Sequence, residues 1–133
     1  MSAWKMILVV AGSALALAAC GGSADNSGGG GGGGGCNAST TVSGTAAQVV
    51  KIVPDPNTIG AYDPKTVSVK VGQAVEWDWT DASSQHTVTA DDGSFDSGLC
   101  SQGTKFAYTF TKAGTFTYKC TIHSGMMGTV TVS

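Results

Sequence analysis

Hydrophobic and polar residues alternate along five short runs of the chain. The runs are Lys65–Val71, Ala74–Trp79, Lys105–Thr111, Gly114–Cys120 and Gly128–Ser133. In the first run Val67, Val69 and Val71 fall on one side of the chain and polar residues on the other. A period of two is that of a β-strand with one buried face. Because no window of ten or more residues shows a helical period, the chain predicts an all-β fold.

Turn-forming residues separate these runs. The pattern is interrupted at Gly72, Gly93, Gly114 and Gly125, and Pro54, Pro56 and Pro64 precede the first run. Short strands at regular spacing, each with one apolar face, predict antiparallel packing in a β-sandwich or a small barrel. We expect about seven to eight strands.

The N-terminal segment has the features of an export signal. Lys5 is followed by an uncharged apolar run from Met6 to Ala19. This run is shorter than the roughly 20 residues that span a bilayer, but it suits the hydrophobic region of a signal peptide. The residues Leu17–Cys20, "LAAC", resemble a bacterial lipobox, so we expect residues 1–19 to be removed and Cys20 to carry a lipid. The alternative is an ordinary signal peptide with Cys20 incidental.

A glycine-rich linker follows. Fifteen residues separate Cys20 from Cys36, and ten of them are glycine. Such a stretch has no side chains to bury and acts as a flexible tether. We therefore expect residues 20–35 to be a lipid-anchored linker and residues 36–133 to be the folded domain.

The charge composition excludes one class of partner. The chain of 133 residues has a formal net charge of -2, and its seven basic residues are all lysines. A phosphate-binding surface needs clustered cations and favours the bidentate guanidinium of arginine. We therefore expect no nucleic-acid binding.

Metal-binding side chains gather near the C-terminus, in "CTIHSGMMG". Cys120 shares a strand face with Phe116 and Tyr118, so its sulfur is expected to point inward at the end of the strand. His123 follows three positions later and Met126 three after that. One short loop can therefore present a thiolate, an imidazole and a thioether to one point.

A fourth donor comes from "SSQHTVTA". Its alternation places His86, Val88 and Ala90 on one face, so His86 can point to the core side of the sheet. Two imidazoles, a thiolate and a thioether form the set of a blue-copper site, with the thioether as a weak axial ligand. The paired cysteine or histidine spacings of a structural zinc site do not occur in the chain.

At these residues the sequence resembles the cupredoxins, the small blue copper proteins that include plastocyanin, amicyanin, pseudoazurin and halocyanin. The resemblance is carried by "HTVT", "FDSG", "AGTFTYKCTIH" and "MMGTVTV", and it extends over Val49–Ser133. It implies a Greek-key β-sandwich that binds one copper ion. The Cys-x-x-His-x-x-Met spacing is similar to that of amicyanin and pseudoazurin, and it selects Met126 over Met127 as the axial ligand.

The sequence departs from the family at two positions. Many cupredoxins carry asparagine after the first histidine ligand, where this chain has Thr87. We expect Thr87 and Thr121 to replace the side-chain link that holds the ligand loop. Ile122 stands where a proline often precedes the second histidine ligand.

Two further cysteines remain in the expected domain. If Cys120 binds copper, Cys36 and Cys100 are the natural disulfide of an exported protein. The alternative is a bond between Cys100 and Cys120, which would abolish the copper site.

The expected function is single-electron transfer between redox proteins. The resemblance implies that these proteins dock near the solvent-facing edge of His123. The chain shows no nucleophile and base pair and no phosphate loop, so we do not expect an enzyme. We expect an exported monomer, lipid-anchored through Cys20 to a bacterial membrane and facing the periplasm or the extracellular side. The alternatives are a copper chaperone or storage module, and a structural sandwich with no metal.

Overall fold

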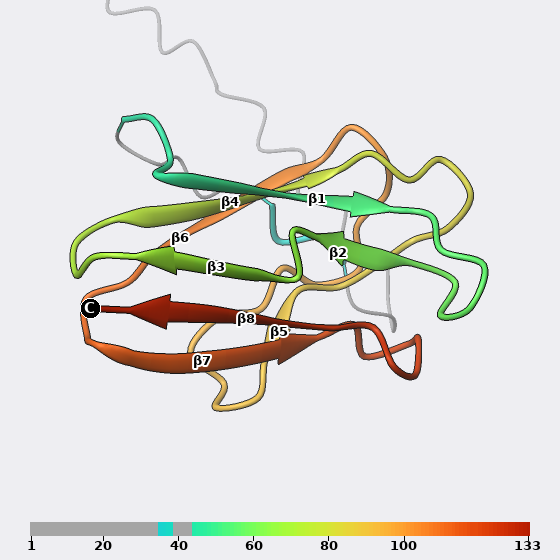
Figure 1. Cartoon of the computed structure of the whole chain (residues 1–133). Coiled ribbons are helices and arrows are strands. Elements are labelled where there is room, and N and C mark those ends of the chain that lie inside the picture. The colour runs from blue at the N-terminus through green and yellow to red at the C-terminus, as the bar shows by residue number, and fades with distance from the viewer. Residues whose placement is uncertain (1–34, 39–43) are drawn as a thin grey trace, which may run out of the picture. The chain divides into compact units, whose positions relative to one another are not determined.

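The computed structural model describes residues 35–38 and 44–133 (Figure 1). The predicted signal peptide, the lipid anchor at Cys20 and all of the linker before residue 35 lie outside the described residues. The strands are β1 (Gln48–Val53), β2 (Ala61–Asp63), β3 (Thr66–Val69), β4 (Ala74–Trp79), β5 (Thr89–Ala90), β6 (Lys105–Thr109), β7 (Gly114–Lys119) and β8 (Met127–Val132). The described part of the chain contains no helix that could cross a membrane. The all-β prediction is confirmed.

The eight strands form two sheets of four. One sheet has the order β2-β1-β4-β6 and the other the order β3-β8-β7-β5. Figure 1 shows the two layers, with β1 and β4 in one and β7 and β8 in the other. Between β2 and β7 the chain changes sheet at every connection. These crossing connections are those of a Greek-key sandwich, so the predicted architecture is confirmed.

The predicted antiparallel pairing is wrong for two pairs of strands. β1 runs parallel to β4, with Val50 opposite Trp77, and β3 runs parallel to β8, with Val67 opposite Val130. The chain passes through the other sheet between the members of each pair. Such a crossover can return the chain in its original direction, whereas a hairpin always reverses it.

The core consists of the apolar faces that the alternation predicts. Val75, Trp77 and Trp79 of β4 are all at most 1% exposed. The indole of Trp77 packs against Phe95, with ring centroids 5.3 Å apart, and against Tyr118 at 5.4 Å. Large buried aromatic rings contribute most of the apolar area that stabilises a domain of this size.

One residue of the predicted core lies on the surface. Val71 is 48% exposed, although its spacing matches Val67 and Val69. β3 ends at Val69, and Val71 begins the turn that includes Gly72. The alternation of side chains therefore no longer applies at Val71.

Cys36 and Cys100 are joined by a disulfide, and Cys120 is free. The alternative bond between Cys100 and Cys120 therefore does not form. Cys100 also pairs with His86 through two backbone hydrogen bonds, each 3.0 Å from nitrogen to oxygen. The disulfide thus holds the segment that lies beside one of the candidate ligands.

Candidate metal centre

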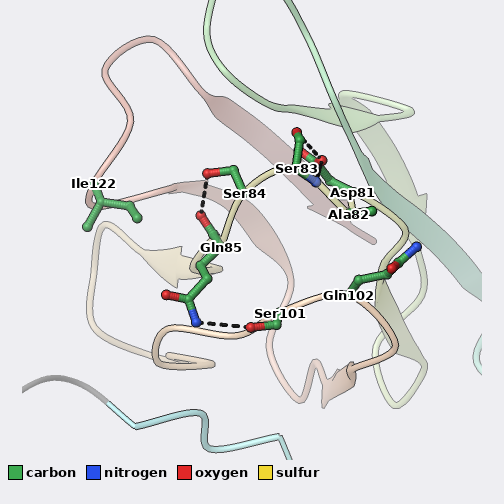
Figure 2. Close-up of a pocket in the computed structure, with 8 residues that line it drawn as sticks. All are labelled: Asp81, Ala82, Ser83, Ser84, Gln85, Ser101, Gln102 and Ile122. Atoms are coloured by element: carbon green, nitrogen blue, oxygen red, sulfur yellow. Dashed lines mark hydrogen bonds between the residues drawn. The ribbon is translucent and has the colours of Figure 1, made fainter.

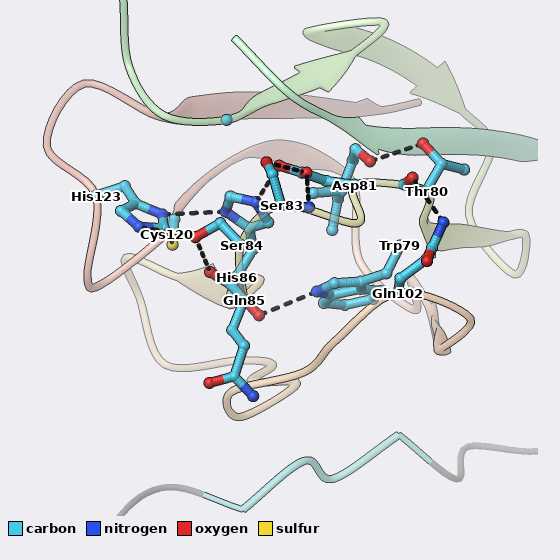
Figure 3. Close-up of polar contacts among 12 residues, drawn as sticks. Trp79, Thr80, Asp81, Ser83, Ser84, Gln85, His86, Gln102, Cys120 and His123 are labelled. Atoms are coloured by element: carbon cyan, nitrogen blue, oxygen red, sulfur yellow. Dashed lines mark hydrogen bonds and ion pairs between the residues drawn. The ribbon is translucent and has the colours of Figure 1, made fainter. Parts of the chain in front are cut away.

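Three predicted ligands meet at the end of the sandwich where β4 and β7 finish. His86 lies in the connection from β4 to β5, Cys120 directly follows β7, and His123 lies in the turn before β8. Their ligand atoms all lie within 4.8 Å of one another. Nδ1 of His123 is 3.0 Å from Nδ1 of His86 and 3.5 Å from Sγ of Cys120 (Figure 3). One sulfur and two nitrogens therefore converge on one point.

The ligand loop is closed by its own backbone. The amide of Cys120 donates to the carbonyl of Met126 at 3.0 Å, and the amide of Met126 donates to the carbonyl of His123 at 3.4 Å. This closure leaves Met126 2% exposed, whereas Met127 is 54% exposed. Of the two candidate thioethers, only that of Met126 is enclosed by the fold.

Thr87 supports the thiol of Cys120. Its backbone amide donates to Sγ of Cys120 at 3.4 Å. Its hydroxyl oxygen accepts the backbone N–H of Thr121 at 2.9 Å and lies 3.3 Å from the hydroxyl of Thr121. The link between Thr87 and Thr121 that we predicted in place of the family's asparagine is therefore present.

Replacing Thr87 by valine tests what this link contributes. Valine keeps the shape and the backbone amide but removes the oxygen that accepts from Thr121. Because Thr87 is buried but Thr121 is exposed, we expect the free energy of unfolding to fall by about 0.5–1.5 kcal/mol, the usual net contribution of one hydrogen bond. Urea denaturation of the metal-free protein measures it. Thr121→Ser, which keeps the backbone N–H, is the control, and an equal loss in both variants would contradict the assignment.

A buried carboxylate holds the other ring nitrogen of His86. Nε2 of His86 is 2.8 Å from Oδ2 of Asp81, and both side chains are 0% exposed. The indole N–H of Trp79 donates to the carbonyl of His86 at 3.0 Å, which fixes the backbone at the same residue (Figure 3). Sequence reasoning missed Asp81. The segment "DASSQH" resembles a polar turn, and nothing in it shows that the carboxylate is buried.

Local contacts shift two pKa values in the site. Burial acts to raise the pKa of Asp81, but hydrogen bonds from Ser83 and His86 outweigh it and hold this pKa below 3.8. Burial, together with the neighbouring His86, lowers the pKa of His123 below 6.5. These shifts favour an ionised carboxylate at Asp81 and a neutral imidazole at His123, and neutral imidazole is the form that binds a metal.

Gly60 packs directly against the ring of His86. A Cβ atom added at Gly60 would lie 2.3 Å from Cε1 of His86 and 2.9 Å from each ring nitrogen. The preceding residue, Ile59, has a positive φ of 67°. The loop from β1 to β2 therefore places the backbone of Gly60 directly against the ring of His86, and no larger residue at position 60 would allow this contact.

We expect Gly60→Ala to displace His86 and to weaken metal binding by at least about tenfold, as the loss of a supporting contact commonly does. The added methyl group overlaps the imidazole, and the ring is enclosed and cannot swing away without loss of packing. Competitive titration with a chromophoric copper chelator measures the affinity. Gly35→Ala, where an added Cβ meets nothing within 4 Å, is the matched control. Equal affinities in the two variants would show that Gly60 does not position His86.

The donor set fits copper. A thiolate is a soft ligand that suits Cu(I), and imidazole suits both oxidation states. Cys120 is a free and buried cysteine, so oxidation to a disulfide does not remove it from the site. The three side chains are brought together from two separate connections, and the fold fixes their relative positions.

Comparison with known proteins identifies the family. A model of copper-binding proteins of the plastocyanin/azurin family matches residues 48–133. The chain belongs to this family, and its metal is copper. The predicted membership of the cupredoxins is confirmed, and His86, Cys120 and His123 are placed to form the copper site.

Individual relatives agree with this assignment. Halocyanin of Natronomonas pharaonis is 35% identical over 91 residues, which are 64% of this chain and 56% of the halocyanin. A purple cupredoxin from Nitrosopumilus maritimus superposes with a TM-score of 0.54 at 29% identity, covering 62% of this chain and 98% of that one. An oxidised amicyanin variant has a TM-score of 0.55 at 26% identity, with coverages of 76% and 92%. The chain thus spans little more than half the length of the halocyanin.

Proposed function

We propose that this protein is a type 1 blue copper protein that transfers single electrons between redox partners. The observation that carries the proposal is the convergence of His86, Cys120 and His123 within 4.8 Å, with His86 and Cys120 buried. When bound, copper supplies a one-electron couple between Cu(II) and Cu(I). A buried His2Cys set that is held in place by the fold moves little when the charge on the metal changes, and this favours fast transfer.

Met126 is proposed as the weak axial ligand. Its burial beside the ligand loop supports this role, and the exposure of Met127 argues against the neighbouring thioether. Met126→Leu removes an electron-pair donor, and the more highly charged Cu(II) loses more from this than Cu(I) does. We therefore expect a more positive reduction potential, by about 59 mV for each tenfold change in the reduction equilibrium. Voltammetry of the copper-loaded protein measures the shift. Met127→Leu is the control, and a larger shift in that variant would reverse the assignment.

Redox partners are proposed to dock over the ligand loop. Ile122 and Met127 are 53% and 54% exposed, and together with His123 they line a surface pocket over this loop. Exposed apolar side chains around a partly exposed ligand suit small, short-lived interfaces, which a carrier needs in order to release its partner. In this arrangement the electron enters and leaves through the edge of His123.

We further propose that the protein is exported and held at the outer face of a membrane by a lipid on Cys20. The disulfide between Cys36 and Cys100 supports an oxidising compartment. The glycine-rich linker gives the domain, which we take to begin at Cys36, freedom to reach its partners. A monomer and the absence of enzymatic turnover belong to the same proposal, since four protein ligands would leave no open position on the metal.

Reversible one-electron electrochemistry tests the proposal. The copper-loaded protein is expected to give an intense visible absorption when oxidised, to lose it on reduction by one electron, and to recover it on reoxidation. Tight binding of Cu(I) without a stable coloured Cu(II) form would instead support a copper chaperone or storage module. Failure to bind both Cu(II) and Cu(I) would support a structural β-sandwich that binds no metal.

A further inference from the structure

We propose that Asp81 is a positioning residue of the copper site, whose buried carboxylate fixes the tautomer of His86 and stabilises the oxidised metal. The effect on the oxidised metal rests on the proposed electron-transfer function. The tautomer part of the inference concerns the metal-free protein and stands independently.

Both carboxylate oxygens of Asp81 are occupied. Oδ2 lies 2.8 Å from Nε2 of His86, while Oδ1 accepts the backbone N–H of Ser83 at 2.7 Å and the Ser83 hydroxyl at 2.5 Å. The backbone N–H of Asp81 donates to the carbonyl of Ile52 at 2.9 Å. The backbone of Asp81 is therefore held by β1 and its carboxylate by its own turn, and Figure 3 shows the carboxylate directed at the imidazole.

This geometry selects one tautomer of His86. An ionised carboxylate can only accept hydrogen bonds, so Nε2 of His86 must carry the proton. In the neutral ring Nδ1 then carries the lone pair, and this nitrogen lies 3.0 Å from Nδ1 of His123. The partner of one ring nitrogen thus decides that the other is available to the metal.

The loop that carries Asp81 is closed over its side chain. Residues 81–85 line a shallow surface pocket together with Ser101, Gln102 and Ile122 (Figure 2). The amide of Gln85 donates to the hydroxyl of Ser101 at 2.9 Å, which ties the loop to the segment after Cys100. The carboxylate of Asp81 remains 0% exposed behind this polar surface. Solvent therefore does not contact the carboxylate directly.

The buried charge biases the copper couple. With the Cys120 thiolate and the Asp81 carboxylate, Cu(II) gives a net charge of zero, since two positive charges meet two negative ones. If bound Cu(II) took up one electron from a donor protein and became Cu(I), the same groups would sum to one excess negative charge. An uncompensated charge is costly in a buried site. Asp81 therefore favours Cu(II) and lowers the reduction potential.

Asp81→Asn tests the redox part, because it removes the charge and keeps the size and an accepting oxygen. The expected result is a reduction potential more positive by at least 59 mV, equivalent to a tenfold or greater change in the one-electron reduction equilibrium. Asp78→Asn is the matched control. Asp78 also lies on the β4 side of the site, but it is 24% exposed and paired with Lys105 at 3.2 Å, so its loss is expected to change that equilibrium less than threefold. Equal shifts in the two variants would overturn this part.

The tautomer part is measured on the metal-free protein by ¹⁵N NMR of the histidine rings. The wild type is expected to show His86 protonated at Nε2, and Asp81→Leu is expected to lose this preference. Protonation of His86 at Nδ1 in the wild type would overturn the proposal even if no variant folds. If the wild type shows the Nε2 tautomer but copper gives no reversible couple, the proposed electron-transfer function fails while the positioning role stands.

Discussion

Replacing Cys120 by serine is expected to abolish the visible absorption of the Cu(II) protein and to weaken copper binding by more than about 100-fold. The thiolate supplies the soft, negatively charged donor of the site, and a serine hydroxyl is neutral at pH 7 and a poor ligand for copper. Losing an outer-sphere partner alone costs about 10–100-fold in metal affinity, so losing a direct ligand costs more. Titration of the metal-free protein with Cu(II), followed by absorption spectroscopy, measures both effects.

The control for this variant lies in the same loop. Ser124→Ala changes an exposed residue next to His123 and is expected to keep both colour and affinity. The fold should survive in Cys120→Ser, because the hydrogen bond from the backbone N–H of Cys120 to the carbonyl of Met126 does not involve the sulfur. Blue colour retained in Cys120→Ser would mean that the thiolate is not the ligand.

The second large effect is expected from the disulfide. Cys36→Ser combined with Cys100→Ala should lower the free energy of unfolding by about 2–4 kcal/mol, since the bond closes a long loop in the unfolded chain. The two cysteines are 64 positions apart. Urea denaturation of the metal-free protein, compared with the wild type, measures the loss.

Two further observations accompany the disulfide variant. Mass spectrometry of the wild type under non-reducing conditions is expected to show a peptide that joins Cys36 to Cys100. Treatment of the wild type with a reductant should reproduce the stability of the double variant, which controls for the substitutions themselves. Free thiols at both positions, or unchanged stability of the double variant, would contradict the assignment.

Strands β3, β4, β6, β7 and β8 could be predicted because the alternation within each of them is local. Val75, Trp77 and Trp79 repeat every second position, and all three are buried in the structure. The parallel pairing of β1 with β4 could not be predicted in this way. It depends on which sheets are joined by β2 and β3, the two strands between them. Alternation shows that a strand has a buried face, but it contains no information about the neighbour of that strand.

The ligand loop could be inferred because Cys120 and His123 are close in sequence and chemically distinctive. His86 lies 34 positions before Cys120. It could still be inferred, because the alternation in "SSQHTVTA" directs it to the core face and its imidazole completes the donor set. Asp81 and Gly60 had no comparable signal. Their roles depend on contacts with the ring of His86 that only the folded chain creates, one a hydrogen bond of 2.8 Å and the other a close backbone approach.

X-ray absorption at the copper edge of the Cu(II)-loaded protein tests the central claim most directly. The account predicts one short copper–sulfur distance, from Cys120, together with two nitrogen scatterers from the imidazoles of His86 and His123. A first shell of nitrogen and oxygen alone, with no short sulfur, would contradict it.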